Sequence, residues 1–184
     1  MYREFTDAEQ NTVRIAGEQI YQCKTVQINY TTYNVRHDGD TINPWIYPDI
    51  MVNSPETGPD AQPFWYAHVI GIFHAMVSST HQDLEVLVRS WHHMDFLWVC
   101  WFGKEPSQYC HRFQFGCLLK IGFVESTDNY AFTFLDPKQA IRGVHLIPAF
   151  TEGHSKALLP VKKTTVCILN PNENNDWLNF YINM

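Results

Sequence analysis

Hydrophobic residues in this chain occur in short runs that turn-forming residues separate. The densest run, QPFWYAHVIGIFHAMV at residues 62–77, is rich in β-branched and aromatic side chains, which favour a strand over a helix. Gly71 in the middle of this run predicts a bulge or a sharp bend. A second strong strand is predicted for MDFLWVCWFG, residues 94–103.

Shorter segments have the same character. Val26, Ile28 and Tyr30 alternate with polar residues, which is the period of two expected for a half-buried strand. Turns are predicted where Asp38-Gly39 and the prolines of NPWIYP interrupt the pattern. Further strands are predicted at residues 49–54, 118–126, 130–136, 144–150 and 176–184.

One short helix is predicted over residues 136–142. Asp136 can cap it, Pro137 suits the first helical position, and Gly143 can terminate it. Residues 81–90 form either one or two helical turns or a hairpin loop, and residues 3–16 form either a loose arm or an irregular helix.

These elements predict a mainly β fold, a small barrel or sandwich with one or two short helices. The length of 184 residues is typical of one domain. We expect an N-terminal arm at 1–19 and a single β-rich domain at 20–184, with a loop or linker at about 151–163.

The charge balance argues against a nucleic-acid-binding domain. The chain has 13 Lys and Arg against 19 Asp and Glu, a formal net charge of -6. An overall basic footprint is therefore excluded, and DNA binding is expected to be weak at most. Packing of the terminal segments against each other would create a local basic patch, and its candidate residues are Arg14, Lys24, Arg36, Lys162 and Lys163.

The cysteines and the hydropathy pattern bear on location. Five cysteines, widely spaced and without a CxxC pair, are typical of reduced thiols rather than of a secreted disulfide framework. No leader and no membrane-spanning apolar run is recognised. We expect a nuclear or cytoplasmic protein that is not secreted and has no membrane partner.

No motif for catalysis or cofactor binding is found. Cys100 lies in an apolar strand, where a free cysteine usually acts as a small core residue. His92 and His93 are adjacent, so in a strand they point to opposite faces and do not easily share an ion. We therefore predict no catalytic residue, no metal site and no cofactor.

Aromatic residues on the two strongest strands form the main candidate site: Trp65, Tyr66, Trp98, Trp101 and Phe102. Alternation places Trp65 and Tyr66 on opposite faces, and Trp98 and Phe102 opposite Trp101. One face builds the core. The other either packs as well or presents a binding surface for a methylated lysine or a peptide.

Several blocks of the chain, in order, resemble a known family. They include VQINYTTYNVRHDGDTINPWIYPDIMVNSPE, PFWYAHVIGIFHAMV, MDFLWVCWFG and AFTFLDPKQAIRGVHLIPAF. From about residue 20 onward they resemble the C-terminal region of fungal Plavaka-type transposases of the Kyakuja–Dileera–Zisupton superfamily. The resemblance implies a catalytic RNase-H-like domain upstream of this region, so no catalytic acid is carried onto this chain.

The chain departs from the family at basic positions. Where this chain has Arg36-His37, the family usually has Arg-Arg, and where it has Trp45-Ile46-Tyr47, the family usually has Arg-Thr-His. The family also commonly has Arg in place of His68 and of Cys100. The strand order is also similar to bromo-adjacent homology (BAH) modules, which resemble SH3-like barrels and bind chromatin or proteins. The two resemblances imply a non-catalytic interaction module, a decayed or domesticated fragment that contacts protein or chromatin. The alternative is an accessory part of an active DNA transposase.

Overall fold

The computed structural model describes residues 6–7, 11–32, 37–59, 61–79, 90–104, 118–155 and 176–183, and these residues are mainly β, as expected. The strands are β1 (Val13–Ile15), β2 (Tyr21–Cys23), β3 (Val26–Thr31), β4 (His37–Ile42), β5 (Asp49–Asn53), β6 (Phe64–Ser79), β7 (His92–Lys104), β8 (Lys120–Phe123), β9 (Phe132–Leu135), β10 (Ala140–Gly143), β11 (His145–Pro148), β12 (His154–Ser155), β13 (Asp176–Trp177) and β14 (Asn179–Asn183). Within the described ranges, no helix has the length and apolar character needed to cross a membrane.

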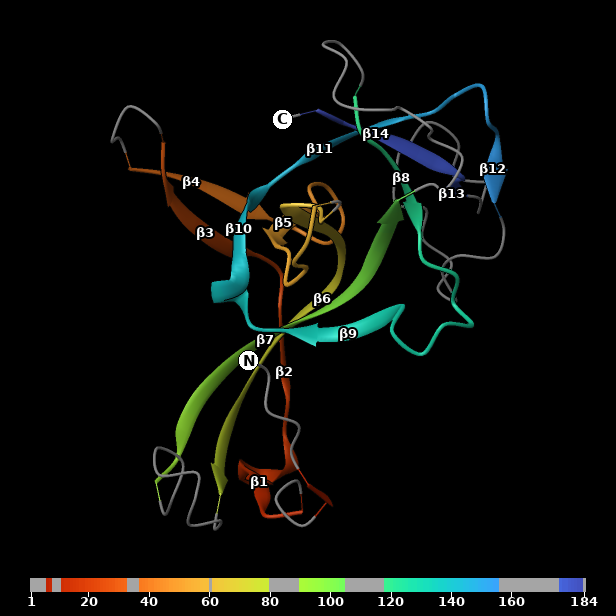
Figure 1. Ribbon diagram of the computed structural model, residues 1–184. Helices are drawn as coiled ribbons and strands as arrows, with labels where there is room; N and C mark the ends of the chain where they lie inside the picture. Colours follow the sequence, from red (N-terminus) through yellow and green to blue (C-terminus); the bar gives the residue numbers. More distant parts are fainter. Residues whose placement is uncertain are drawn as a thin grey trace.

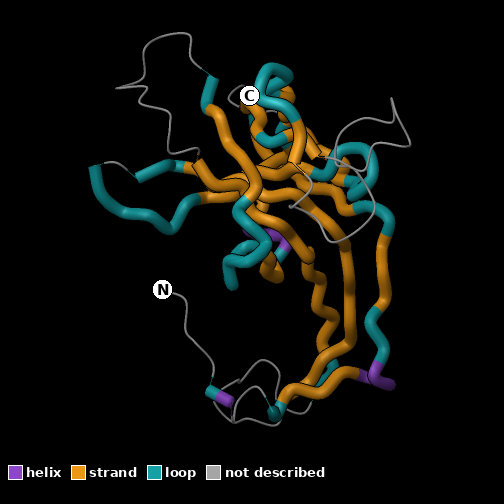
Figure 2. Tube along the Cα trace, turned by 90° about the vertical axis from the view of Figure 1, so that its right-hand side faces the viewer, coloured by secondary structure: helices purple, strands orange, loops and turns teal. Residues whose placement is uncertain are grey.

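One antiparallel sheet organises the molecule. Its order is β10-β5-β6-β7-β8-β14-β11, with β1 and β2 paired to β6 and β9 paired to β7. Among the described strands, β10 and β11 at the two ends do not pair, so the sheet is open and does not close into a barrel. Figures 1 and 2 show β6 and β7 extending from the packed body as a long curved ribbon, and β1 and β2 lie along its β6 side.

The bulge predicted at Gly71 is confirmed. The β6–β7 register shifts between Val69 and Gly71, which leaves Ile70 as the extra residue. An extra residue reverses which side chains point to each face. Val69 therefore lies on the same face as Ile72, and both belong to one core cluster.

Both faces of the central strands are packed. The β3–β4 hairpin contributes Ile28 and Ile42 to a buried cluster on one face that also holds Val69 and Val99; we call this cluster the first core. Strands β8 and β14 contribute to the second core on the other face, where the Phe180 ring meets Phe102 of β7 and Phe123 of β8. The body is therefore sandwich-like.

The alternation predicted for Val26, Ile28 and Tyr30 is confirmed. All three side chains are at least half-buried, and the residues between them are exposed.

The turn predicted at Asp38-Gly39 is wrong. Both residues lie within β4, where Gly39 pairs with Asn29 of β3. A Cβ atom on Gly39 would lie 2.9 Å from Asn29 Oδ1, so glycine here leaves room for the polar side chains of β3. The turn predicted within NPWIYP is confirmed by the bridge between Asn43 and Tyr47.

The helix predicted over residues 136–142 is shorter than expected. Asp136 caps it as predicted, with its Oδ1 accepting the Lys138 backbone N–H at 2.9 Å, but the helix is a single 3-10 turn at Pro137–Gln139. The following residues instead form β10, because pairing with β5 satisfies their backbone groups.

The N-terminal and linker segments are partly described. Val13–Ile15 is a strand paired to Val77–Ser79, a non-local pairing that the expected arm or helix did not include. A 3-10 turn follows at Ala16–Glu18. Of the expected linker, His154–Ser155 pairs with Asp176–Trp177, and the remainder from residue 156 lies outside the described residues, as do residues 81–89.

Candidate functional site

The five predicted aromatic residues do not form one surface. Trp65 and Trp101 pack against the first core, whereas Tyr66 and Phe102 are buried in the second core. Trp98 is half-buried, with its ring centroid 6.5 Å from that of Phe132. The predicted alternation is thus confirmed, but both faces of the sheet are packed.

Trp65 and Trp101 form a structural pair. Their rings meet edge to face with centroids 5.6 Å apart. Trp65 Nε1 donates to Glu56 Oε1 at 2.9 Å, and Trp101 Nε1 donates to Thr133 Oγ1 at 2.7 Å. The hydrogen bond from the Gln62 backbone, followed by that from Trp65, lowers the pKa of Glu56. These contacts fasten the loop before β6 onto the sheet, and they give the two indoles a packing role.

A different set of rings lies partly open on the other face of the ribbon. We call it the aromatic stripe, and its members come from β6, β7 and β9: Phe73, Phe96, Trp98, Phe132 and Phe134. Cross-strand register brings them together, since Phe73 pairs with Phe96 and Trp98 pairs with Phe134.

Three rings of the stripe contact one another in succession, and the last of them is exposed. Phe73 and Phe96 stack with centroids 5.6 Å apart, and Phe96 meets Phe134 edge to face at 5.6 Å. Phe134 is 71% exposed, while Phe132 packs against the second core at the inner end. An aromatic side chain exposed to this extent, next to other rings, is typical of an interaction surface.

Strand β9 also offers backbone groups. Among the described strands it pairs with β7 alone, so its other edge is unpaired there. In Figure 1, β9 lies beside β7 at the lower edge of the body. Edge strands present a row of N–H and C=O groups that another extended chain can pair with.

Sequence reasoning placed only Trp98 in this group. The spacing of Phe132 and Phe134 within YAFTFLD indicates that the two rings share a face, and this signal was available. The position of Phe134 beside Phe96, and of Phe132 beside Trp98, depends on the pairing of β9 with β7. These two strands are about 35 residues apart in the chain, and local patterns do not specify their pairing.

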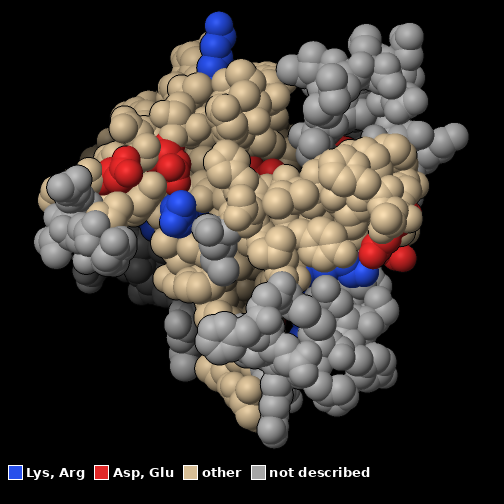
Figure 3. Space-filling view, turned by 90° about the horizontal axis from the view of Figure 1, so that it is seen from above, with Lys and Arg blue, Asp and Glu red and all other residues tan. Residues whose placement is uncertain are grey.

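The predicted basic patch is only partly described. Arg14 and Lys24 are exposed, whereas Arg36, Lys162 and Lys163 lie outside the described residues. Arg14 pairs with Ser78, and Cys23, just before Lys24, pairs with Ile72. Six residues along a strand separate these points by roughly 20 Å, too far for one phosphate-binding cluster. On the face seen in Figure 3, Lys and Arg side chains lie apart from one another, some beside acidic residues.

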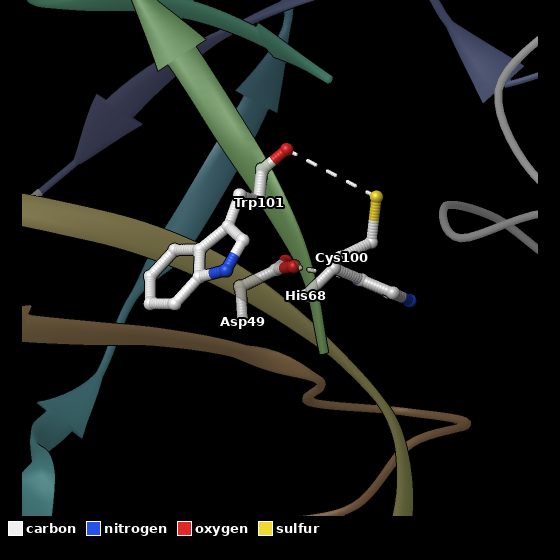
Figure 4. A network of polar contacts seen from close by, with 4 residues as sticks. All are labelled: Asp49, His68, Cys100 and Trp101. Carbon is white, nitrogen blue, oxygen red and sulfur yellow. Dashed lines mark hydrogen bonds and ion pairs between the residues drawn. The ribbon is translucent and has the colours of Figure 1, made fainter. Parts of the chain in front are cut away.

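A buried polar group lies in the body. Asp49 of β5 and His68 of β6 are register partners, and Asp49 Oδ1 is 2.8 Å from His68 Nδ1. A carboxylate oxygen accepts the hydrogen bond, so His68 Nδ1–H is the donor. Cys100 lies opposite His68 on β7, which brings an acid, a histidine and a thiol together (Figure 4).

This group is not arranged for nucleophilic catalysis. Cys100 is fully buried, and its thiol points to the Trp101 carbonyl oxygen, 3.9 Å away (Figure 4). Burial, followed by the charge of Asp176, raises the pKa of the Cys100 thiol to about 12. A nucleophilic cysteine needs a lowered pKa and access to solvent. Asp49 and His68 instead satisfy each other inside the fold, with the His68 ring edge to face against Phe123.

We therefore expect Cys100 to resist alkylation in the folded protein. With iodoacetamide at pH 8, peptide mapping by mass spectrometry should show Cys100 reacting at least ~100-fold more slowly than in denaturant, because its thiolate is scarce and enclosed. The half-buried Cys23 is the control within the same molecule. Alkylation of Cys100 as fast as Cys23 in the folded state would contradict this assignment.

Comparison of the chain with family models, with curated proteins and with solved structures found no match. The resemblances noted in the sequence are therefore neither supported nor opposed by these comparisons. Any function rests on the residues and geometry described above.

Proposed function

We propose that this protein is a non-catalytic interaction module that binds an extended peptide segment of a protein partner. The peptide adds as a strand to the open edge of β9, and its apolar side chains contact the aromatic stripe. The observation that carries the proposal is Phe134, which is 71% exposed on an edge strand beside Phe96.

The chemistry of the surface favours a peptide over DNA. The stripe consists of rings, and strand addition combines backbone hydrogen bonds with pockets for alternate side chains. DNA affinity depends largely on clustered Lys and Arg, and the chain carries a formal net charge of -6. At near-physiological salt we accordingly expect at most weak, non-specific DNA binding.

The resemblance to transposase tails extends the proposal to the kind of partner. On that basis the partner belongs to a transposition or chromatin complex in the nucleus, and the chain is a decayed or domesticated fragment. The alternative is an accessory part of an active transposase. The alternative would be favoured if a transposase catalytic domain with an Asp/Asp/Glu site bound to this chain at the aromatic stripe.

Replacing Phe134 by alanine should weaken peptide binding by at least about 10-fold, because exposed aromatic anchors dominate such interfaces. Peptides selected from a random 12-residue library against the native protein would be labelled, and their affinity measured by fluorescence anisotropy. Tyr130→Ala is the matched control, since Tyr130 is 79% exposed but lies in the turn before β9.

A second arm tests strand addition itself. Methylating alternate backbone nitrogens of the selected peptide keeps its side chains but removes the hydrogen bonds that an added strand makes. One of the two alternating patterns should abolish binding. Equal losses in Phe134→Ala and Tyr130→Ala would refute the aromatic stripe as the site, and full binding of both methylated peptides would refute strand addition.

A further inference from the structure

A second cluster with binding chemistry lies on the ribbon, on the face opposite the aromatic stripe. His74 of β6 is the direct register partner of Asp95 of β7. His93 lies two residues before Asp95 on the same strand, so its side chain points to the same face. Ligand atoms of these three residues all lie within 4.8 Å of one another.

Neighbouring side chains hold His74 in place. Its ring stacks on Tyr21 of β2 with centroids 5.2 Å apart, and the centroid of the more exposed His93 ring lies 5.0 Å away. Cys23 Sγ lies 3.2 Å from His74 Nδ1. A metal-binding histidine typically has its second ring nitrogen fixed by another group, and the Cys23 thiol supplies such a contact here.

The other two residues have the freedom to close on an ion. The His93 and Asp95 side chains are 54% and 59% exposed, and His93 Nδ1 lies 3.5 Å from Asp95 Oδ2. Donor atoms around a tetrahedral zinc ion are roughly 3.3 Å apart, given metal–ligand distances near 2.0–2.1 Å. The three donors therefore need to approach by about 1–1.5 Å at most, which side-chain rotation on the surface provides.

From this geometry we infer that His74, His93 and Asp95 form a binding site for a divalent transition-metal ion, with zinc as the best-suited member. Two imidazoles and one carboxylate are a recurrent zinc ligand set that leaves a fourth position for water or another donor. Imidazole also suits Cu²⁺ and Ni²⁺, whereas Mg²⁺ and Ca²⁺ prefer oxygen ligands. This inference is independent of the proposed peptide site.

Spacing in the sequence did not reveal this cluster, because His92-His93 was the only close histidine pair and its members point to opposite faces. The bulge at Ile70 is decisive. Without it, His74 would pair with Met94 and point away from His93 and Asp95, because a one-residue slip moves every side chain to the other face.

The test is isothermal titration of the untagged full-length chain with Zn²⁺ after treatment with a chelator. We expect one site that His93→Ala or Asp95→Asn weakens by at least about 10-fold, since changing even an outer-shell partner of a metal ligand costs 10–100-fold in affinity. His92→Ala is the matched control, because His92 is adjacent in sequence but on the opposite face of β7.

A second readout separates a specific site from unfolding of a variant. Zn²⁺ should raise the thermal unfolding midpoint of the native chain and of His92→Ala, and should leave that of His93→Ala unchanged, because a ligand stabilises only the state that binds it. Mg²⁺ should have no effect. The inference would be overturned if His93→Ala and Asp95→Asn left zinc binding unchanged, or if His92→Ala weakened it equally. It would also be overturned if the native chain showed no one-to-one binding at 100 µM Zn²⁺, a concentration about 10² times a micromolar Kd.

Discussion

Replacing Phe180 by alanine is expected to lower the free energy of unfolding by about 3–5 kcal/mol, the usual cost of truncating a buried phenylalanine. Phe180 is fully buried on β14, and its ring meets Phe102 and Phe123 edge to face at 5.7 and 5.9 Å. Phe102 and Phe123 themselves stack at 4.4 Å. Removing the third ring leaves a cavity that these two cannot fill without giving up their own contact.

Urea unfolding followed by tryptophan fluorescence measures this loss. Phe134→Ala is the matched control, because Phe134 is 71% exposed and its removal should cost no more than its edge-to-face contact with Phe96 is worth, about 0.5–1.5 kcal/mol. The same control shows that the peptide-binding variant remains folded. If Phe180→Ala lost no more stability than Phe134→Ala, the second core would not be packed as described.

Replacing Asp49 by alanine should cost about 2–4 kcal/mol, because it leaves the buried imidazole of His68 without its hydrogen-bond partner. Both residues are buried, with side chains only 11% and 6% exposed, and their contact is 2.8 Å long. Asp49→Asn keeps an oxygen acceptor in the same place, so it should cost clearly less than Asp49→Ala.

A double-mutant cycle with His68→Ala separates the pair from the general cost of each substitution. The His93–Asp95 pair offers the same chemistry on the surface, with atoms 3.5 Å apart and side chains more than half exposed. In chelator, Asp95→Ala should cost below about 1 kcal/mol, as exposed ion pairs do. No coupling between positions 49 and 68, or equal losses in Asp49→Ala and Asp95→Ala, would contradict the structural role of the buried pair.

Local features of the fold were predictable from the sequence because they depend on neighbouring residues. The apolar run at 62–77 and the run at 94–103 became β6 and β7. Gly71 marked the bulge, and Asp136 with Pro137 marked the capped turn. Alternation also separated Trp65 from Tyr66, since the period of a strand assigns adjacent side chains to opposite faces.

The candidate sites were less predictable because they depend on pairing between distant segments. The aromatic stripe needs β9 beside β7, and the histidine cluster needs the β6–β7 register after the bulge. The five predicted aromatic residues were chosen by residue type, and the packing of both sheet faces then placed Tyr66 and Phe102 in the second core. Gly39 looked like a turn residue until its partner strand was known.

The sequence by itself determined the mainly β character, the positions of the longest strands, the place of the bulge and the alternation of adjacent side chains within a regular strand segment. These follow from side-chain shape, backbone freedom and the period of two. Only the tertiary structure decided which strands are neighbours, and therefore that Phe134 lies beside Phe96 and His74 beside Asp95. The physical reason is that strand pairing is driven by burial of apolar surface over the whole sheet. A site formed by residues of several strands therefore depends on the register between them, which no single segment specifies.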